Sequence, residues 1–425
     1  MAEQMKQEAA GKTIPAGYKQ TEVGVIPEDW EVAPIGSVLS ITTGARNTQD
    51  KVDDGRYPFF VRSQTVERIN TYSFDGEAVL TAGDGVGTGK IFHYVNGKFD
   101  FHQRVYLMYN FGERVSGYFF YLYFSNNFFE RIMSMTAKSS VDSVRREMIA
   151  DMKMVLPSKV EQTAIANVLS DSDALIGALE QLIAKKQAIK SATMQQLLTG
   201  RTRLPTFALH PDGTPKGYKP SELGEIPEDW EVSALSAICD VRDGTHDSPR
   251  YKDNGIPLVT SKNIVGDVLD LTNVSLISPE DAFEINKRSK VDKGDIIMSM
   301  IGTVGSAVLL NDEPDFCIKN VALFKPKRAI GEFLVQLIHS KHFQDYLEDC
   351  MDGGIQKFVS LGTLRNMEIV LPSIEEQTAI ATILSDMDNE LQALTQKLEK
   401  ARALKQGMMQ QLLTGKTRLP LAAGA

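Results

Sequence analysis

Two long stretches of the chain carry apolar residues at the alternating three- and four-residue spacing of one helical face. The stripe comprises Ile176, Leu179, Ile183 and Leu197 in the first stretch and Leu391, Leu394, Leu398 and Leu412 in the second. So narrow a seam is typical of helices that pair in a coiled coil, although Lys186, Lys190 and Lys405 interrupt it. We expect the two helices to pair with each other. The alternative is that each packs only on its own domain.

Local signals set the expected limits of these helices. A Ser-x-x-Glu capping box at residues 158–161 and again at 373–376 predicts helix starts near residues 159 and 374. A second signal, Ser-x-x-Asp at 170–173 and 385–388, predicts a short helix, a break and then a long helix. Gly200 and Gly415 are expected to end the long helices, because glycine tolerates the left-handed cap.

The helical stretches belong to a duplicated unit. Residues 156–205 and 371–420 are identical at 30 of 50 positions without a gap, so one structural part is used twice. Residues 17–32 and 217–232 form a second repeat, and we call them the strap segments. Each strap contains one of the chain's two tryptophans, Trp30 or Trp230, which we expect to anchor it on its domain.

Between the repeats lie two variable blocks, residues 33–155 and 233–370. The first has short apolar runs separated by glycine turns, which predict strands at 57–61, 78–80, 91–95 and 105–109, and an aromatic-rich helix at 118–133. The second follows the same plan with a different sequence. The predicted fold is α+β, with two mixed, mainly β domains separated by two long antiparallel helices in a pseudo-two-fold arrangement. The expected parts are a tail (1–16), domain 1 (17–155), helical region 1 (156–205), a linker (206–216), domain 2 (217–370) and helical region 2 (371–425).

Composition narrows the possible compartments and partners. The net charge is −9 and neither variable block is basic, so any binding to DNA must depend on local patches or on a basic partner. No apolar run approaches the roughly 18 residues of a membrane helix. The polar beginning of the chain and three scattered cysteines favour a cytoplasmic location.

The order of these parts resembles the specificity subunits of type I restriction–modification enzymes. The motifs that carry the resemblance are EQTAIA, LSDxD, QQLLTG and IPEDW, each of which occurs twice, together with DGTHDSP at 243–249 and two glycine hairpins. The resemblance implies that each variable block is a target recognition domain for half of a split double-stranded DNA sequence. It also implies two methyltransferase subunits and restriction motor–nuclease subunits as partners. The chain itself would be non-catalytic, and S-adenosylmethionine, ATP and Mg²⁺ would be used by the other subunits.

Candidate DNA-binding residues lie in loops that follow predicted strands. Arginine recognises guanine, and asparagine or glutamine recognises adenine, through paired hydrogen bonds. The candidates in the first block are Arg62, Ser63, Gln64, Lys90, His102, Gln103 and Arg104, with Lys138, Ser139 and Arg145 as phosphate contacts. The candidates in the second block are Thr245, His246, Lys262, Asn263, Lys319 and Asn320.

Other kinds of site have weaker support. The glycine run at 83–90 lacks the spacing of a phosphate-binding loop and is better explained as a tight hairpin near DNA. His339 and His342 have no third ligand at a suggestive spacing, so we expect surface histidines and no metal site. Two alternative functions stay open: a stand-alone DNA methyltransferase or nuclease with an unrecognised site, and a coiled-coil adaptor that binds only proteins.

Overall fold

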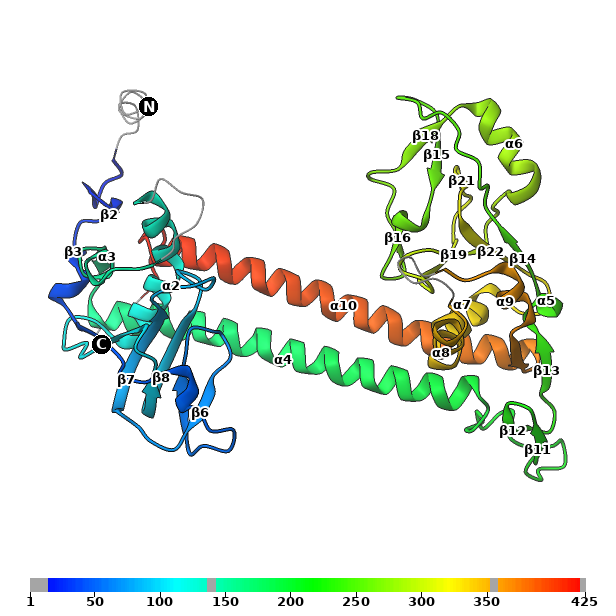
Figure 1. Ribbon diagram of the computed structural model, residues 1–425, viewed down its shortest axis with the longest axis horizontal. Coiled ribbons are helices and arrows are strands. Elements are labelled where there is room, and N and C mark those ends of the chain that lie inside the picture. The colour runs from blue at the N-terminus through cyan, green and yellow to red at the C-terminus, as the bar shows by residue number, and fades with distance from the viewer. Residues whose placement is uncertain (1–13, 136–142, 352–357, 421–425) are drawn as a thin grey trace. The chain divides into compact units, whose positions relative to one another are not determined.

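The computed structural model describes residues 14–135, 143–351 and 358–420, which fall into two compact units (Figure 1). Unit 1 consists of the described parts of Met1–Leu179 and Lys397–Ala425, and unit 2 is Glu180–Gln396. Each unit therefore contains one strap, one variable block, the beginning of one long helix and the end of the other. Within the described residues, no helix has both the length and the apolar character needed to cross a bilayer.

The long helices are α4 (Lys159–Leu198) and α10 (Ile374–Leu412), and both begin where the capping serines predict. The predicted break is wrong, because each helix is continuous. Ser172, one of the polar residues near the expected break, donates its hydroxyl to the carbonyl of Val168 at 2.8 Å, so it is satisfied without ending the helix. Gly200 and Gly415 follow the helix ends with φ of +70° each, as predicted.

Within each unit the two helices run antiparallel. In unit 2, Lys186 bonds Glu390 and Lys190 bonds Asp388, so the partner's number falls as the lysine's number rises. In unit 1, Lys405 of α10 bonds Asp173 of α4. The lysines that interrupt the seam are thus paired with acids of the other helix. Among the seam residues, Leu179, Leu197, Leu398 and Leu412 are buried, and Ile176, Ile183, Leu391 and Leu394 are half-buried.

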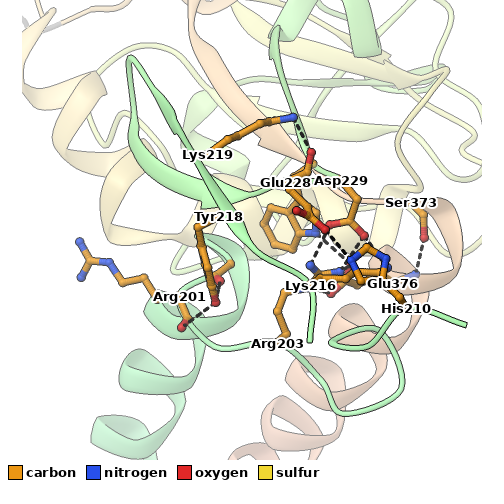
Figure 2. A network of polar contacts seen from close by, with 12 residues as sticks. Arg201, Arg203, His210, Lys216, Tyr218, Lys219, Glu228, Asp229, Ser373 and Glu376 are labelled. Carbon is orange, nitrogen blue, oxygen red and sulfur yellow. Dashed lines mark hydrogen bonds and ion pairs between the residues drawn. The ribbon is translucent and has the colours of Figure 1, made fainter. Parts of the chain in front are cut away.

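The first turn of each long helix is tied to a strap. In unit 2, Glu376 is 2% exposed and accepts hydrogen bonds from the Trp230 indole at 2.9 Å and from Arg203 at 2.7 and 2.8 Å (Figure 2). Arg203 also bonds both carboxylate oxygens of Asp229. Ser373 caps the helix as expected, but Glu376 does not complete the capping box, because its carboxylate is turned towards Trp230 and Arg203.

Unit 1 repeats this junction with equivalent residues. Glu161 accepts from the Trp30 indole at 3.0 Å and from Arg418 at 2.9 and 2.7 Å, and Arg418 also bonds Asp29. Trp30 and Trp230 are each 1% exposed, which confirms that they anchor the straps. Each junction therefore joins a strap and the start of one long helix to the segment that follows the other long helix.

The variable block of unit 1 is built on a six-stranded sheet of order β4-β9-β7-β8-β5-β6. Helix α2 contributes fully buried phenylalanines, including Phe120 and Phe124, to a core shared with Ile165 and Leu169 of α4. The elements of unit 1 are β1 (Tyr18–Thr21), β2 (Gly24–Pro27), β3 (Glu31–Pro34), β4 (Ser40–Thr43), β5 (Tyr57–Phe60), β6 (Glu67–Ile69), β7 (Phe74–Ala82), β8 (Phe92–Phe101), β9 (Val105–Tyr109), α2 (Gly117–Ser134), α3 (Arg146–Ala150) and β10 (Lys153–Leu156).

The variable block of unit 2 has a four-stranded sheet, β14-β22-β19-β20, and a three-stranded sheet, β18-β15-β21. Its elements are β11 (Tyr218–Ser221), β12 (Gly224–Pro227), β13 (Glu231–Ala234), α5 (Leu235–Ile238), β14 (Cys239–Asp243), β15 (Ile256–Val259), β16 (Ile264–Val265), β17 (Val268–Leu269), β18 (Ser275–Ile277), α6 (Pro279–Ser289), β19 (Ile296–Ser299), β20 (Ala307–Leu309), β21 (Cys317–Ile318), β22 (Val321–Pro326), α7 (Gly331–His339), α8 (Lys341–Asp349), α9 (Leu361–Asn366) and β23 (Glu368–Leu371).

The predicted fold class, β-rich domains combined with long paired helices, is confirmed. Two strands of the first block are longer than predicted: β7 has nine residues and β8 has ten. The expectation of a surface position for His339 is wrong, because its side chain is 19% exposed and its Nε2 lies 3.1 Å from the carbonyl of Ala307. The three cysteines are free.

Candidate nucleic-acid interface

In unit 1, one parallel strand pair brings the predicted residues together. Strand β5 pairs with β8 in parallel, with Phe60 opposite Phe101. The carboxyl ends of both strands therefore lie at the same edge of the sheet. The loops at 62–64 and 102–104 therefore lie side by side, joined by a hydrogen bond of 2.9 Å from the His102 amide to the Phe60 carbonyl. This edge of the sheet presents the surface cations of the first block.

Asp84 organises two of these cations. Its carboxylate bonds Arg62 at 2.8 Å and forms an ion pair with Arg104 at 3.7 Å. The arginine side chains are 44% and 63% exposed, whereas that of Asp84 is 19% exposed. An acid shared between two arginines limits their rotamers while leaving N–H groups free to face a ligand. The pair is therefore suited to recognise guanine edges or phosphates.

His102 has a different task from the one expected. It is 5% exposed, and its Nδ1 accepts the Arg104 amide proton at 2.9 Å. Burial, assisted by the neighbouring Arg62, lowers the pKa of His102 and favours the neutral ring. His102 therefore holds the backbone of Arg104 in place and does not present its ring at the surface.

The other predicted residues of unit 1 surround this cluster. Gln103 is exposed and donates to the Asn47 amide oxygen at 2.6 Å, and Gln64 is exposed. Ser63 donates its hydroxyl to Thr65, and Lys90 is exposed with its ammonium 5.4 Å from the centre of the Phe129 ring. Arg145 is exposed beside Val144, whose amide bonds the carbonyl of Gly83. Lys138 and Ser139 lie outside the described residues.

Unit 2 has the same strand arrangement with different side chains. Strand β15 pairs in parallel with β21, with Val259 opposite Ile318. The Lys319 amide bonds the Val259 carbonyl at 2.8 Å, and Thr245 forms a bridge with Lys319. The loops that carry the predicted residues thus meet at the corresponding edge.

The acid of this second cluster is Asp243, which is 5% exposed. It accepts from Arg288 and lies 2.7 Å from His246 Nε2, while His246 Nδ1 lies 2.7 Å from the Asn320 amide oxygen. The hydrogen bonds with Asn320 and Asp243 raise the pKa of His246. The exposed ring is therefore biased towards its cationic form, which attracts an anionic ligand.

The lysines of this cluster and Asn263 have different roles. Lys262 is exposed, and the ammonium of Lys319 donates to Ser248 at 2.7 Å. Asn263 is 8% exposed, accepts from the Thr260 amide and hydroxyl, and donates to the Asp270 carbonyl. Its amide holds the turn after β15 and is not presented to a ligand.

Sequence reasoning missed the acids and some neighbouring groups. Arg46 bonds Asp100, which is 1% exposed and also accepts from Thr71 and Ser73. Arg288 comes from α6 and lies 45 residues from Asp243 in the sequence. The sequence signal that could have identified these acids is an aspartate next to a glycine in a predicted loop, as at Asp84 and Asp243. Within the described residues, no group of three or more His, Cys, Asp or Glu side chains could hold a metal ion.

Comparison with known proteins decides the family. The model of the type I restriction modification DNA specificity domain matches residues 27–191 and 227–402, one match in each half. This chain belongs to that family. DNA binding follows from membership, and the variable blocks are its target recognition domains.

Relatives and solved structures agree with this assignment. The MjaVIII specificity subunit of Methanocaldococcus jannaschii is 28% identical over 420 residues, covering 93% of this chain and 94% of the relative. The EcoDI specificity subunit of Escherichia coli is 30% identical over 230 residues, 51% of this chain and 50% of the relative. The S subunit of a type I restriction–modification system from M. genitalium shares the fold, with a TM-score of 0.60 and 14% identity over 97% of this chain and 99% of that one. A chain from a structure of type I system assembly and conformational transition has a TM-score of 0.53 and 15% identity, over 92% of this chain and 99% of that one.

Proposed function

We propose that this chain is the DNA-specificity subunit of a type I restriction–modification complex and recognises an asymmetric, bipartite target. One observation carries the proposal: the same strand edge occurs in both units but presents different side chains. The first edge carries Arg62 and Arg104, which both pair with Asp84, and the second edge carries His246, Asn320 and Lys319. Because different donors and acceptors select different bases, the two half-sites should differ.

The duplicated junctions support two copies of one partner. Both helix ends carry the sequence QQLLTG followed by Arg or Lys and TRLP, and both pack on a strap through the same Glu, Trp and Arg contacts. A surface that occurs twice is suited to bind the same subunit twice. We assign these positions to two methyltransferase subunits, with restriction subunits joining them. The complex would work in the cytoplasm on double-stranded DNA.

The chemistry is assigned to those partners. In this proposal they bind S-adenosylmethionine, ATP and Mg²⁺, flip the target adenine out of the duplex and methylate it. This chain contributes the choice of sequence and the attachment of the other subunits. A chain of similar fold occurs in a solved structure that concerns complex assembly of a type I restriction–modification system, which supports a subunit that acts within a complex.

Mapping of methylated bases tests the proposal. The chain is expressed with its methyltransferase subunits in a host that lacks other adenine methylation, and methylated positions are mapped across the genome. The expected result is one motif with two unlike halves and a fixed spacer, present only when this chain is present. A continuous motif would contradict the bipartite target. Methyl transfer by the purified chain alone would instead establish a stand-alone methyltransferase.

A further inference from the structure

The turn between β7 and β8 is a rigid glycine-rich loop at the DNA-facing edge of unit 1. Thr88 donates both its amide and its hydroxyl to the carbonyl of Gly85, at 3.1 and 2.6 Å. The amides of Lys90 and Ile91 both donate to the carbonyl of Gly87. Gly85 has a φ of +84°, a conformation that side chains disfavour, so the turn depends on glycine there. These bonds fix the backbone on both sides of the residue between the two glycines.

That residue, Val86, is fully exposed, with a relative accessibility of 101%. No other large hydrophobic residue in the described part of the chain exceeds 66%. The corresponding turn of unit 2 also carries a valine before a glycine, but Val304 packs against the core of its unit. A valine that contacts nothing contributes nothing to folding, and its exposure is specific to the first domain.

The base of the turn is joined to the arginine cluster. The Gly83 amide donates to the Arg104 carbonyl at 2.8 Å, and Asp84 bonds both Arg62 and Arg104. A Cβ placed on Gly87 would lie 3.4 Å from the Arg62 carbonyl oxygen, so the backbone is also close on that side. Val86 is therefore a single apolar side chain on a turn whose base bonds Arg62 and Arg104.

This combination fits the major groove of DNA. Guanidinium groups bond guanine edges or phosphates there, and the C5 methyl of thymine is the apolar group that the groove exposes. Side chains that wedge between base pairs are usually longer than valine. A protein partner would require a larger apolar area around Val86, but Val86 is fully exposed and lies between two glycines.

We propose that Val86 is a specificity residue that contacts the C5 methyl group of a thymine in the half-site recognised by residues 33–155. The inference rests on the proposed function, because it needs the first domain to bind a defined half-site. It adds an apolar determinant to a cluster that otherwise consists of hydrogen-bonding groups. The stiff, β-branched side chain would reach the base without losing much conformational freedom.

The test replaces each thymine of that half-site, in turn, with deoxyuridine, which lacks only the methyl group. Binding of the complex of this chain with its methyltransferase subunits is measured for the wild type and for Val86→Ala. At one position, loss of the methyl should weaken wild-type binding about four-fold, the value of one buried methyl group. Val86→Ala should weaken binding to the thymine DNA by a similar factor and lose the preference for thymine over uracil.

Val160→Ala is the matched control, because Val160 is 43% exposed on the first turn of α4. It should keep the wild-type ratio between thymine and uracil DNA. Equal thermal midpoints for Val86→Ala and the wild type would show that the fold is intact. The inference is overturned if the half-site has no thymine, if Val86→Ala binds like the wild type, or if Val86→Ala keeps the preference. Loss of all sequence preference by the wild-type complex would instead contradict the proposed function itself.

Discussion

Acidic residues hold the candidate DNA-binding cations and the junction arginines of this protein in place. Asp84 and Asp243 lie beneath surface Arg and His side chains, and Glu161 and Glu376 lie beneath the arginines of the junctions. In the proposed function, this arrangement allows a chain of net charge −9 to present cations to DNA. The acids neutralise nearby charge and also fix the orientation of the groups that we propose select a base.

Asp84→Asn should therefore reduce specificity more than affinity. The change removes the shared carboxylate that orients Arg62 and Arg104. Binding of the complex to its target should weaken about ten-fold, within the range of one good base contact. Binding to unrelated DNA should stay equal or become tighter, because a negative charge is lost. Titrations with target and unrelated duplexes at one salt concentration measure both, and a parallel loss on both duplexes would contradict this role.

The two junction arginines form a matched pair for a stability test. The Arg203 side chain is 6% exposed and that of Arg418 is 38% exposed, although each bonds a buried glutamate. Arg203→Ala should cost about 3 kcal/mol of unfolding free energy, because it leaves Glu376 buried without its cation. Arg418→Ala should cost about 1 to 2 kcal/mol, because water can reach its site. Urea unfolding measures both, with the exposed Arg201→Ala as control, and equal losses would argue against burial as the cause.

Asp229 gives unit 2 a defined acid sensitivity. Burial opposes its ionisation, but hydrogen bonds with Arg203 and Lys216 outweigh burial and lower its pKa from 3.8 to about 2. The ionised carboxylate therefore stabilises the fold fully above pH 4, and this contribution is lost as the pH falls through 2. Asp229→Asn should show a shallower loss of unfolding free energy over that interval. Urea midpoints measured across it check the difference, and identical slopes would exclude this carboxylate.

Sequence reasoning found the cations of the first site but not their common partner. Arg62 follows one predicted strand and Arg104 precedes another, whereas the contact of both with Asp84 depends on the parallel pairing of β5 with β8. Such pairing joins residues about 40 positions apart and leaves no local pattern. Glu376 was misassigned for the same reason, because its interaction with Trp230 is set by tertiary packing.

Among the elements, the long helices were the most predictable. Their starts, glycine ends and apolar seam follow from local rules, and the predicted pairing is antiparallel within each unit. The predicted break is wrong because each helix is continuous, and the aspartates of the second signal, Asp173 and Asp388, bond Lys405 and Lys190 of the other helix. The four strands predicted in the first block correspond to β5, β7, β8 and β9, but β4 and β6 were missed. The lengths of β7 and β8 were underestimated, since pairing partners determine where a strand ends.

The seam lysines should fix the register of the paired helices. Lys190 is 16% exposed and bonds Asp388, whereas Lys186 is 35% exposed and bonds Glu390. A double-mutant cycle on Lys190 and Asp388 should give a coupling energy of about 1 kcal/mol, and one on Lys186 and Glu390 about 0.3 kcal/mol. Urea unfolding of the alanine variants provides both values. A coupling near zero for Lys190 and Asp388 would show that the pair does not specify register.

At the scale of the whole molecule, the chain consists of two versions of one plan. Tyr218 bonds the Gly200 carbonyl in unit 2, and Tyr18 bonds the Gly415 carbonyl in unit 1. The contacts that attach each strap to the end of a long helix are therefore the same, while the strand edges of the variable blocks differ. A block, together with the strand that leads into the long helix, should be exchangeable as long as the strap and the long helix are kept.

Exchange of one block tests the central claim most directly. Residues 33–155 are replaced by the first variable block of a related specificity subunit, and methylated bases are mapped in a host that supplies the methyltransferase subunits. We predict a new sequence in one half of the target, with the other half and the spacer unchanged. A change in both halves, or in neither, would contradict the assignment of one half-site to each block.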